Sequence, residues 1–172
     1  TRKLAKLMFT DVEATCISSE DDVTEAMQKT FLKSCIGLSN EMVGGAERLR
    51  EDTLEYVKMR MQFGRSIASF QVTKHKATDM LADVELAKSA AYYAAAAFDD
   101  GESDIAATAS IAKASASEAY MQTAINAVQM HGGIGFTWDN DTHLWFKRAK
   151  SSEVFLGTAD FHRELMMQSW DQ

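Results

Sequence analysis

The chain has 172 residues, of which 46% are hydrophobic and 25% are charged, a mixture typical of a folded globular domain. Its formal net charge of −7 argues against nucleic acid as a partner, and no apolar run approaches the roughly 18 residues that a membrane span needs. Two cysteines are too few for a disulfide framework, so we expect a cytoplasmic protein.

The sequence has no proline, ten methionines and many alanines. Sheet proteins need many turns, and turns use proline and glycine, so this composition predicts an all-α fold of long packed helices. We expect an antiparallel four-helix bundle. Because the chain begins at Thr1 rather than at a methionine, we also expect it to be a piece of a longer protein.

The first 21 residues differ from the rest. Leu7 to Val12 is a short apolar run followed by polar residues, which predicts a β-strand. A lone strand cannot satisfy its own backbone, so we expect its sheet to lie in an upstream domain. We therefore assign residues 1–21 to the end of that domain and a linker, and residues 22–172 to the helical domain.

Apolar residues at spacings of three and four predict three long helices. The first begins at Asp22 or Thr24 and runs to Phe63, with Gly64 as its C-cap. The second covers about residues 70–98, the third about residues 103–131, and shorter helices follow near 141–152 and 157–170. The third helix is apolar on several faces, which predicts that it is buried in the bundle or in a subunit interface.

The histidines and cysteines do not form a metal-binding pattern. No histidine follows a glutamate by three residues, as in di-iron bundles, and there is no Cys-x-x-Cys pair. We expect no metal site.

Two glycine-marked segments could carry chemistry. Arg60 to Ile67, followed by Phe70-Gln71, places arginines and aromatic rings at a helix end. Arginine binds phosphate bidentately, and an aromatic ring can stack on a base. Gln129 to Thr137 has three glycines in four positions, which allows a ligand to approach the backbone closely. Taken singly, each segment also fits an ordinary helix end.

The order and spacing of the two segments together resemble the acyl-CoA dehydrogenase family. Arg60 to Gln71 is similar to the family's Arg-x-x-Phe-Gly…Phe-Gln segment, and Gln129 to Thr137 to its Gln-x-x-Gly-Gly-x-Gly-Phe segment. Arg148 to Lys150 and Phe155 to Thr158 are similar to the stretch that follows. The resemblance implies the C-terminal four-helix domain of an FAD-dependent enzyme that desaturates acyl-CoA thioesters, with residues 1–21 as the end of its middle β-domain.

The resemblance also implies that FAD lies across a subunit interface. Arg60, Phe63 and Gln71 match positions that reach FAD phosphates and adenine from a neighbouring subunit. Gln129, Gly132 and Gly133 match the segment at the adenosine end, and Thr158 matches a residue near the phosphates or ribose. Asp160 falls where a glutamine is common. The implied partners are an acyl-CoA substrate, further subunits in a homo- or hetero-oligomer (a dimer or tetramer), and electron-transfer flavoprotein.

The catalytic base of the family is missing from both of its usual positions. The common pattern Tyr-Glu-Gly-Thr reads Phe155-Leu156-Gly157-Thr158 here, and leucine cannot take a proton. Some branches place the base on the first long helix, where this chain has Ser34. Glu41 and Glu153 are the nearest carboxylates to these positions, and solvated helix charges are the ordinary explanation for both.

Two enzymatic interpretations follow, and a third needs no flavin. The chain belongs either to the non-catalytic type of subunit in a heteromer whose partner supplies the base, which we favour, or to a self-sufficient homomeric dehydrogenase with an unusual base. A flavin-free helical assembly domain is the remaining alternative. Gly37, Gly44 and Gly45 on the first helix leave space that could suit a bulky acyl group, or could serve close helix packing.

Overall fold

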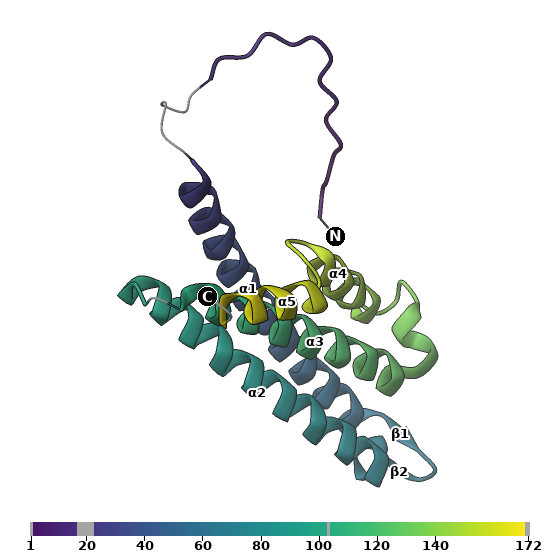
Figure 1. The fold of residues 1–172 in the computed structure, drawn as a ribbon. Coiled ribbons are helices and arrows are strands. Elements are labelled where there is room, and N and C mark those ends of the chain that lie inside the picture. Colours follow the sequence, from purple (N-terminus) through teal and green to yellow (C-terminus); the bar gives the residue numbers. More distant parts are fainter. Residues whose placement is uncertain (1, 17–22, 103, 171–172) are drawn as a thin grey trace.

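The computed structural model describes residues 2–16, 23–102 and 104–170, and within them the fold is a helical bundle (Figure 1). The helices are α1 (Thr24–Met59), α2 (Gln71–Asp100), α3 (Ile105–His131), α4 (Thr142–Val154) and α5 (Ala159–Trp170). Two short strands, β1 (Met61–Gln62) and β2 (Arg65–Ser66), and two 3-10 helices, η1 (Ile67–Ser69) and η2 (Gly132–Phe136), complete the described elements. The all-α prediction is confirmed, and none of these helices is long and apolar enough to cross a bilayer.

Helix α3 lies at the centre of the bundle and packs against α1, α2, α4 and α5 (Figure 1). Its buried side chains are mostly alanine and serine, which lets the neighbouring backbones approach closely. The prediction that this helix is buried in the bundle is therefore confirmed. The first turns of α1 extend beyond the bundle and are exposed.

The C-terminal end of α1 differs from the prediction. The helix ends at Met59 rather than at Phe63, because the Ser66 hydroxyl donates to the last carbonyls of the helix, 2.8 Å from Val57 O and 2.9 Å from Lys58 O. These contacts satisfy acceptors that a helix end otherwise leaves open.

Residues 61–66 form a β-hairpin in place of the predicted helix end. Met61 pairs with Ser66 and Gln62 with Arg65. Phe63 (φ 54°) and Gly64 (φ 76°) form the two-residue turn, and hairpin turns of the type with two positive φ angles favour glycine. The assignment of Gly64 as a helix C-cap was wrong, since this glycine is a turn residue.

The other helix ends agree with the sequence pattern. Helix α2 ends at Gly101, which has a left-handed φ of 71° and donates its N–H to Ala97 O and Phe98 O. Helix α3 ends at Gly132, which has a φ of 66°. Asp22 and Ser103, the predicted starting regions of two helices, lie outside the described residues.

Residues 2–16 form an extended segment that arches away from the bundle, while its first residues return toward α4 (Figure 1). Leu7 and Phe9 are 73% and 75% exposed. The expected strand over residues 7–12 does not form here, because no second strand lies beside it within the described part of the chain.

The Gly44-Gly45 pair of α1 serves helix packing at one of its two positions. A Cβ added to Gly45 would lie 2.8 Å from Cζ and Oη of Tyr120, a fully buried residue of α3. A Cβ on Gly44 would meet no heavy atom within 4 Å. The Tyr120 ring therefore occupies the space that the second glycine leaves.

We expect Gly45→Ala to lower the free energy of unfolding by about 1–3 kcal/mol, because the new Cβ would lie 2.8 Å from the buried Tyr120 ring, which would have to shift. Gly44→Ala is the matched control and should raise stability by about 0.5–1 kcal/mol, since alanine favours the helix. Urea unfolding of both variants measures the difference. Equal stability of the two variants would contradict the packing role of Gly45.

Candidate functional site

The two glycine-marked segments meet in one pocket of about 390 Å³. Arg60, Gln62 and Ile67 line it from the end of α1, the hairpin and η1, and residues 129–134 line it from the end of α3 and η2. The structure thus brings together four of the seven predicted cofactor-binding residues, which are Arg60, Gln129, Gly132 and Gly133.

The backbone of this pocket is shaped for close approach of a ligand. Gly132 has φ 66° and ψ −146°, a conformation that side chains disfavour. A Cβ on Gly133 would meet nothing within 4 Å, so the backbone is open there. Arg60 donates its N–H to Tyr56 O at 2.9 Å and accepts from Ile67 N at 2.9 Å, which fixes its backbone while its side chain stays exposed. A guanidinium, a glutamine amide and open backbone are groups that suit a nucleotide phosphate and base.

Tyr56 and His131 form a stacked pair in the wall of the pocket. Their ring centroids are 4.2 Å apart with an interplanar angle of 17°. His131 Nδ1 lies 2.8 Å from Ala127 O, and burial lowers the pKa of this histidine. No sequence signal marks Tyr56 as a residue of this pocket, because it falls within the apolar pattern of the first helix.

Phe63 and Gln71 lie beside this pocket and do not line it. Phe63 is 90% exposed at the hairpin tip and meets Phe70 edge-on, with ring centroids 6.1 Å apart. The Arg65 guanidinium lies 4.0 Å from the centre of the Phe70 ring. Gln71 opens α2, and its amide nitrogen is 3.2 Å from His75 Nε2. A positive φ at a non-glycine residue costs about 1–3 kcal/mol, and such strain clusters at ligand sites, so the exposed ring of Phe63 is a candidate contact.

Thr158 lies far from this pocket. Its hydroxyl oxygen accepts from Phe161 N at 3.4 Å at the start of α5. The preceding residue, Gly157, accepts from Lys113 of α3 at 2.9 Å. Gln129 lies 16 residues after Lys113 on the same helix, about 24 Å further along at 1.5 Å per residue.

The two usual base positions hold no titratable group in the structure. Leu156 is half-buried against the main hydrophobic core and has a positive φ of 60°. Ser34 is exposed on α1, and its hydroxyl donates to Thr30 O at 2.7 Å.

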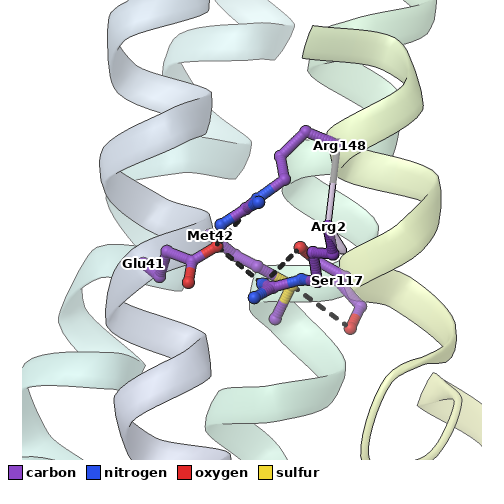
Figure 2. A network of polar contacts seen from close by, with 6 residues as sticks. Arg2, Glu41, Met42, Ser117 and Arg148 are labelled. Carbon is purple, nitrogen blue, oxygen red and sulfur yellow. Dashed lines mark hydrogen bonds and ion pairs between the residues drawn. The ribbon is translucent and has the colours of Figure 1, made fainter. Parts of the chain in front are cut away.

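The two nearby glutamates each pair with cations. Figure 2 shows Arg2 and Arg148 converging on Glu41, with distances of 2.7 Å from each terminal nitrogen to Oε1. Arg2 also donates to Ser152 at 3.2 Å, which ties the N-terminal segment to α4. Glu153 lies 2.5 Å from Lys150 Nζ. Both carboxylates therefore behave as paired helix charges in this chain.

The space that the glycines of α1 were expected to leave for an acyl group is only partly open. Gly44 lines a cavity of about 510 Å³ together with Trp145 and Arg148. Gly45 also borders it, but the Tyr120 ring fills the space above that residue.

The chain matches known proteins along its length. Residues 24–170 match the family model described as "Acyl-CoA dehydrogenase, C-terminal domain". The chain belongs to the acyl-CoA dehydrogenase family. The family resemblance read from the two motifs is thereby confirmed.

Individual relatives support the same family. Acyl-CoA dehydrogenase IpdE2 of Mycobacterium tuberculosis is 36% identical over 99% of this chain and 49% of its own length. A solved FAD complex of PigA superposes with a TM-score of 0.78 at 30% identity, covering 87% of this chain and 39% of that one. A steroid enzyme named Tcur3481-Tcur3483 superposes with a TM-score of 0.82 at 27% identity, covering 86% and 41%. The chain therefore spans about half the length of the curated relative.

Burial of His131 predicts a pH dependence of stability. Its pKa is lowered in the folded state, so the unfolded state binds more protons as the pH falls below about 6.5, and stability is lost on acidification. We expect His131→Phe, which keeps a ring against Tyr56, to lose less stability than the parent chain between about pH 7.5 and about pH 5.5.

His75→Phe, at an exposed position of α2, is the control and should keep the parent's pH dependence. Urea unfolding at both pH values measures the difference. An unchanged acid sensitivity in His131→Phe would show that this ring does not contribute.

Proposed function

We propose that this chain is the C-terminal domain of an FAD-dependent acyl-CoA dehydrogenase and that it contributes an FAD site and a subunit interface to α,β-desaturation of an acyl-CoA thioester. The observation that carries the proposal is the single pocket lined by Arg60, Gln129, Gly132 and Gly133. Residues 1–21 would end the middle β-domain, and residues 22–172 would form the FAD-binding and oligomerisation domain.

The residues of the pocket fit the adenosine diphosphate part of FAD. The Arg60 guanidinium would pair with a phosphate, and the open backbone at Gly133 would let the nucleotide approach within hydrogen-bonding distance. Gln129 offers an amide donor and acceptor to the adenine edge or ribose. When bound, the flavin accepts the hydride from the substrate. This chain's part is to bind and orient that cofactor.

One FAD would have to be shared between chains. The Arg60 pocket and Thr158 are separated by about 24 Å along α3, so they cannot hold the same phosphate group within one chain. The exposed ring of Phe63 extends from the same end of the domain as the pocket and is available to a neighbouring subunit. Both features support an interface between subunits at this end.

A partner subunit would supply the catalytic base. Leu156 and Ser34 hold no carboxylate, while the residues predicted to face FAD are kept. The steroid enzyme among the structural relatives carries two component names, which is compatible with two chains that share one task. A self-sufficient enzyme using Glu41 or Glu153 is the competing proposal, and both carboxylates lie in ion pairs here. A flavin-free assembly domain is the third alternative, and it would not require a glycine-lined pocket.

The surface of α2 is the candidate for subunit contacts. Because α3 is enclosed by four helices, its apolar faces are largely buried within this chain. Leu86, Tyr92 and Tyr93 of α2 are instead exposed by 71%, 57% and 57%. We propose that these residues help to form a homo- or hetero-oligomer, either a dimer or a tetramer. We further propose that electron-transfer flavoprotein is the electron acceptor and that the protein is located in the cytoplasm.

Arg60→Ala should weaken FAD binding by roughly ten- to hundredfold, because a hydrogen-bonded ion pair to phosphate is lost. The measurement is flavin fluorescence during titration of FAD into the natural protein that contains this chain. Arg48→Ala is the matched control, since Arg48 is an exposed residue of α1 paired with Asp52. Equal affinity in the two variants would contradict the phosphate contact.

The natural protein should reduce flavin slowly without a partner, because general-base catalysis contributes about 10² to 10⁴ in rate. Flavin bleaching by acyl-CoA thioesters measures this step for the protein alone and together with a second acyl-CoA dehydrogenase chain that carries a glutamate at the position of Leu156. Normal bleaching by the protein alone would overturn the partner-supplied base, and Glu41→Gln and Glu153→Gln would then identify the base.

Leu156→Glu should raise the bleaching rate of the protein alone, because the turn that holds Leu156 is already formed. Leu156→Gln, of similar size but without a base, is the control and should give no increase. An increase in both variants would show that polarity rather than proton transfer is responsible.

A further inference from the structure

We propose that Lys113 and His162 are positioning residues that together fix the backbone of the turn formed by Leu156, Gly157 and Thr158. The functional meaning of this turn rests on the proposed function, in which Thr158 contacts FAD. The contacts that hold the turn are properties of this chain alone.

Lys113 is fully buried in the N-terminal half of α3, with an exposed fraction of 0%. Its ammonium group donates to Gly157 O at 2.9 Å, to Ser117 Oγ at 2.9 Å and to Glu153 O at 3.3 Å. Two of these acceptors are backbone carbonyls at and after the end of α4. A lysine ammonium has three protons, so the three oxygens use all of its donors.

The charge of Lys113 is balanced by dipoles rather than by a hydrogen-bonded carboxylate. Its two carbonyl acceptors, Glu153 O and Gly157 O, lie at and just after the C-terminal end of α4, where the helix dipole favours a cation. The Glu153 carboxylate pairs with Lys150, and only the carbonyl of Glu153 contacts Lys113. Burial lowers the pKa of Lys113, because removal from water disfavours the charged form. An apolar side chain of similar size would fill the same space without the cost of burying a charge, so the contacts of the ammonium group point to a role in holding the turn.

The contacts of Lys113 continue into α1 through Ser117. The Ser117 hydroxyl oxygen lies 3.9 Å from Met42 Sδ, and Figure 2 shows these two residues beside the Glu41 ion pairs. Through Ser117, Lys113 therefore connects the turn to the packed residues of α1 and α3.

His162 holds the preceding carbonyl from the other side. It is 1% exposed on α5, and its Nε2 lies 2.9 Å from Leu156 O. Its ring is parallel to that of Phe31 on α1, with centroids 6.1 Å apart. Burial lowers the pKa of His162, which favours the neutral ring, and the neutral ring donates from Nε2 when it bonds a carbonyl. Two consecutive carbonyls of the turn are thus bound by buried side chains from two different helices.

The backbone of the turn needs such support. Leu156 has φ 60° and Gly157 has φ 103°, and a leucine in this region costs about 1–3 kcal/mol unless the surroundings impose it. A Cβ on Gly157 would lie 2.3 Å from Phe161 Cδ1, so only glycine fits the second position. The bonds to Leu156 O and Gly157 O keep these strained residues in place. They also set Thr158, whose hydroxyl oxygen caps the start of α5.

Both anchors bind backbone oxygens, so neither of these two contacts requires a particular side chain at position 156. This explains how the chain keeps an ordered turn for Thr158 although a leucine stands at the family's base position. Lys113 itself does not act as the base, since all of its protons are engaged and it is sealed from solvent.

The test is amide hydrogen exchange of residues 155–162 in the FAD-free natural protein. Lys113→Met has nearly the same volume but no donors, so exchange in these residues should rise about ten- to hundredfold while α1 and α2 stay protected. Lys76→Met is the matched control, because Lys76 donates to Asn126 between α2 and α3, and it should leave the turn unchanged. Unchanged exchange of residues 155–162 in Lys113→Met would overturn the proposal.

A second pair of variants covers the case in which Lys113→Met does not fold. His162→Gln keeps a donor that can reach Leu156 O, whereas His162→Leu does not. Exchange of the turn should rise in His162→Leu and be at least partly restored in His162→Gln. Equal exchange in both variants would show that His162 only fills space and would overturn its positioning role.

The affinity for FAD separates this proposal from the proposed function. If Lys113→Met loosens the turn and also weakens FAD binding, both are supported. If the turn loosens and FAD binds as before, the positioning role stands and the contact between Thr158 and FAD is refuted.

Discussion

The close packing of four helices around α3 is the constraint on which the rest of the structure depends. Only small side chains let α1, α2, α4 and α5 approach one helix together, which explains why its buried face is mostly alanine and serine. The same helix carries Gln129 near its C-terminal end and Lys113 in its N-terminal half. The 16 residues between them therefore set the distance between the Arg60 pocket and the turn formed by Leu156, Gly157 and Thr158.

Several polar side chains in and around this alanine-rich core bind the backbone. Lys113 and His162 bind carbonyls of the turn, Ser66 binds the last carbonyls of α1, and His131 binds Ala127 O. Each of these contacts lies where a helix ends or the chain reverses, so these four side chains shape the ends of helices, while apolar contacts hold the helices together. The predicted ligand contacts lie at those same ends.

The sequence predicted the helices well because their apolar residues repeat with helical spacing and glycines mark two of the three long helix ends. The prediction of the helix end failed at residues 60–66. There the Ser66 hydroxyl bonds to Val57 O, nine residues earlier in the chain, and no local sequence pattern marks this contact. The motifs predicted that Arg60 and Gln129 belong to one site, whereas only the three-dimensional structure shows that Tyr56 also lines it. The strand over residues 7–12 needs a partner strand, which periodicity does not supply. Nothing in the local sequence marks Lys113, since its burial depends on the packing of α3 against the other helices.

We propose that one FAD is bound by the Arg60 pocket of this chain and by a turn of another chain that corresponds to residues 156–158 here. The most direct measurement is a crystal structure of the natural assembly with FAD bound. We predict that each FAD in the Arg60 pocket places its flavin ring against a turn from a different chain, and that this turn carries a carboxylate where this chain has Leu156. An FAD that contacts Arg60 and Thr158 of one and the same chain, or that is not bound in the Arg60 pocket, would contradict the proposed sharing of FAD between chains.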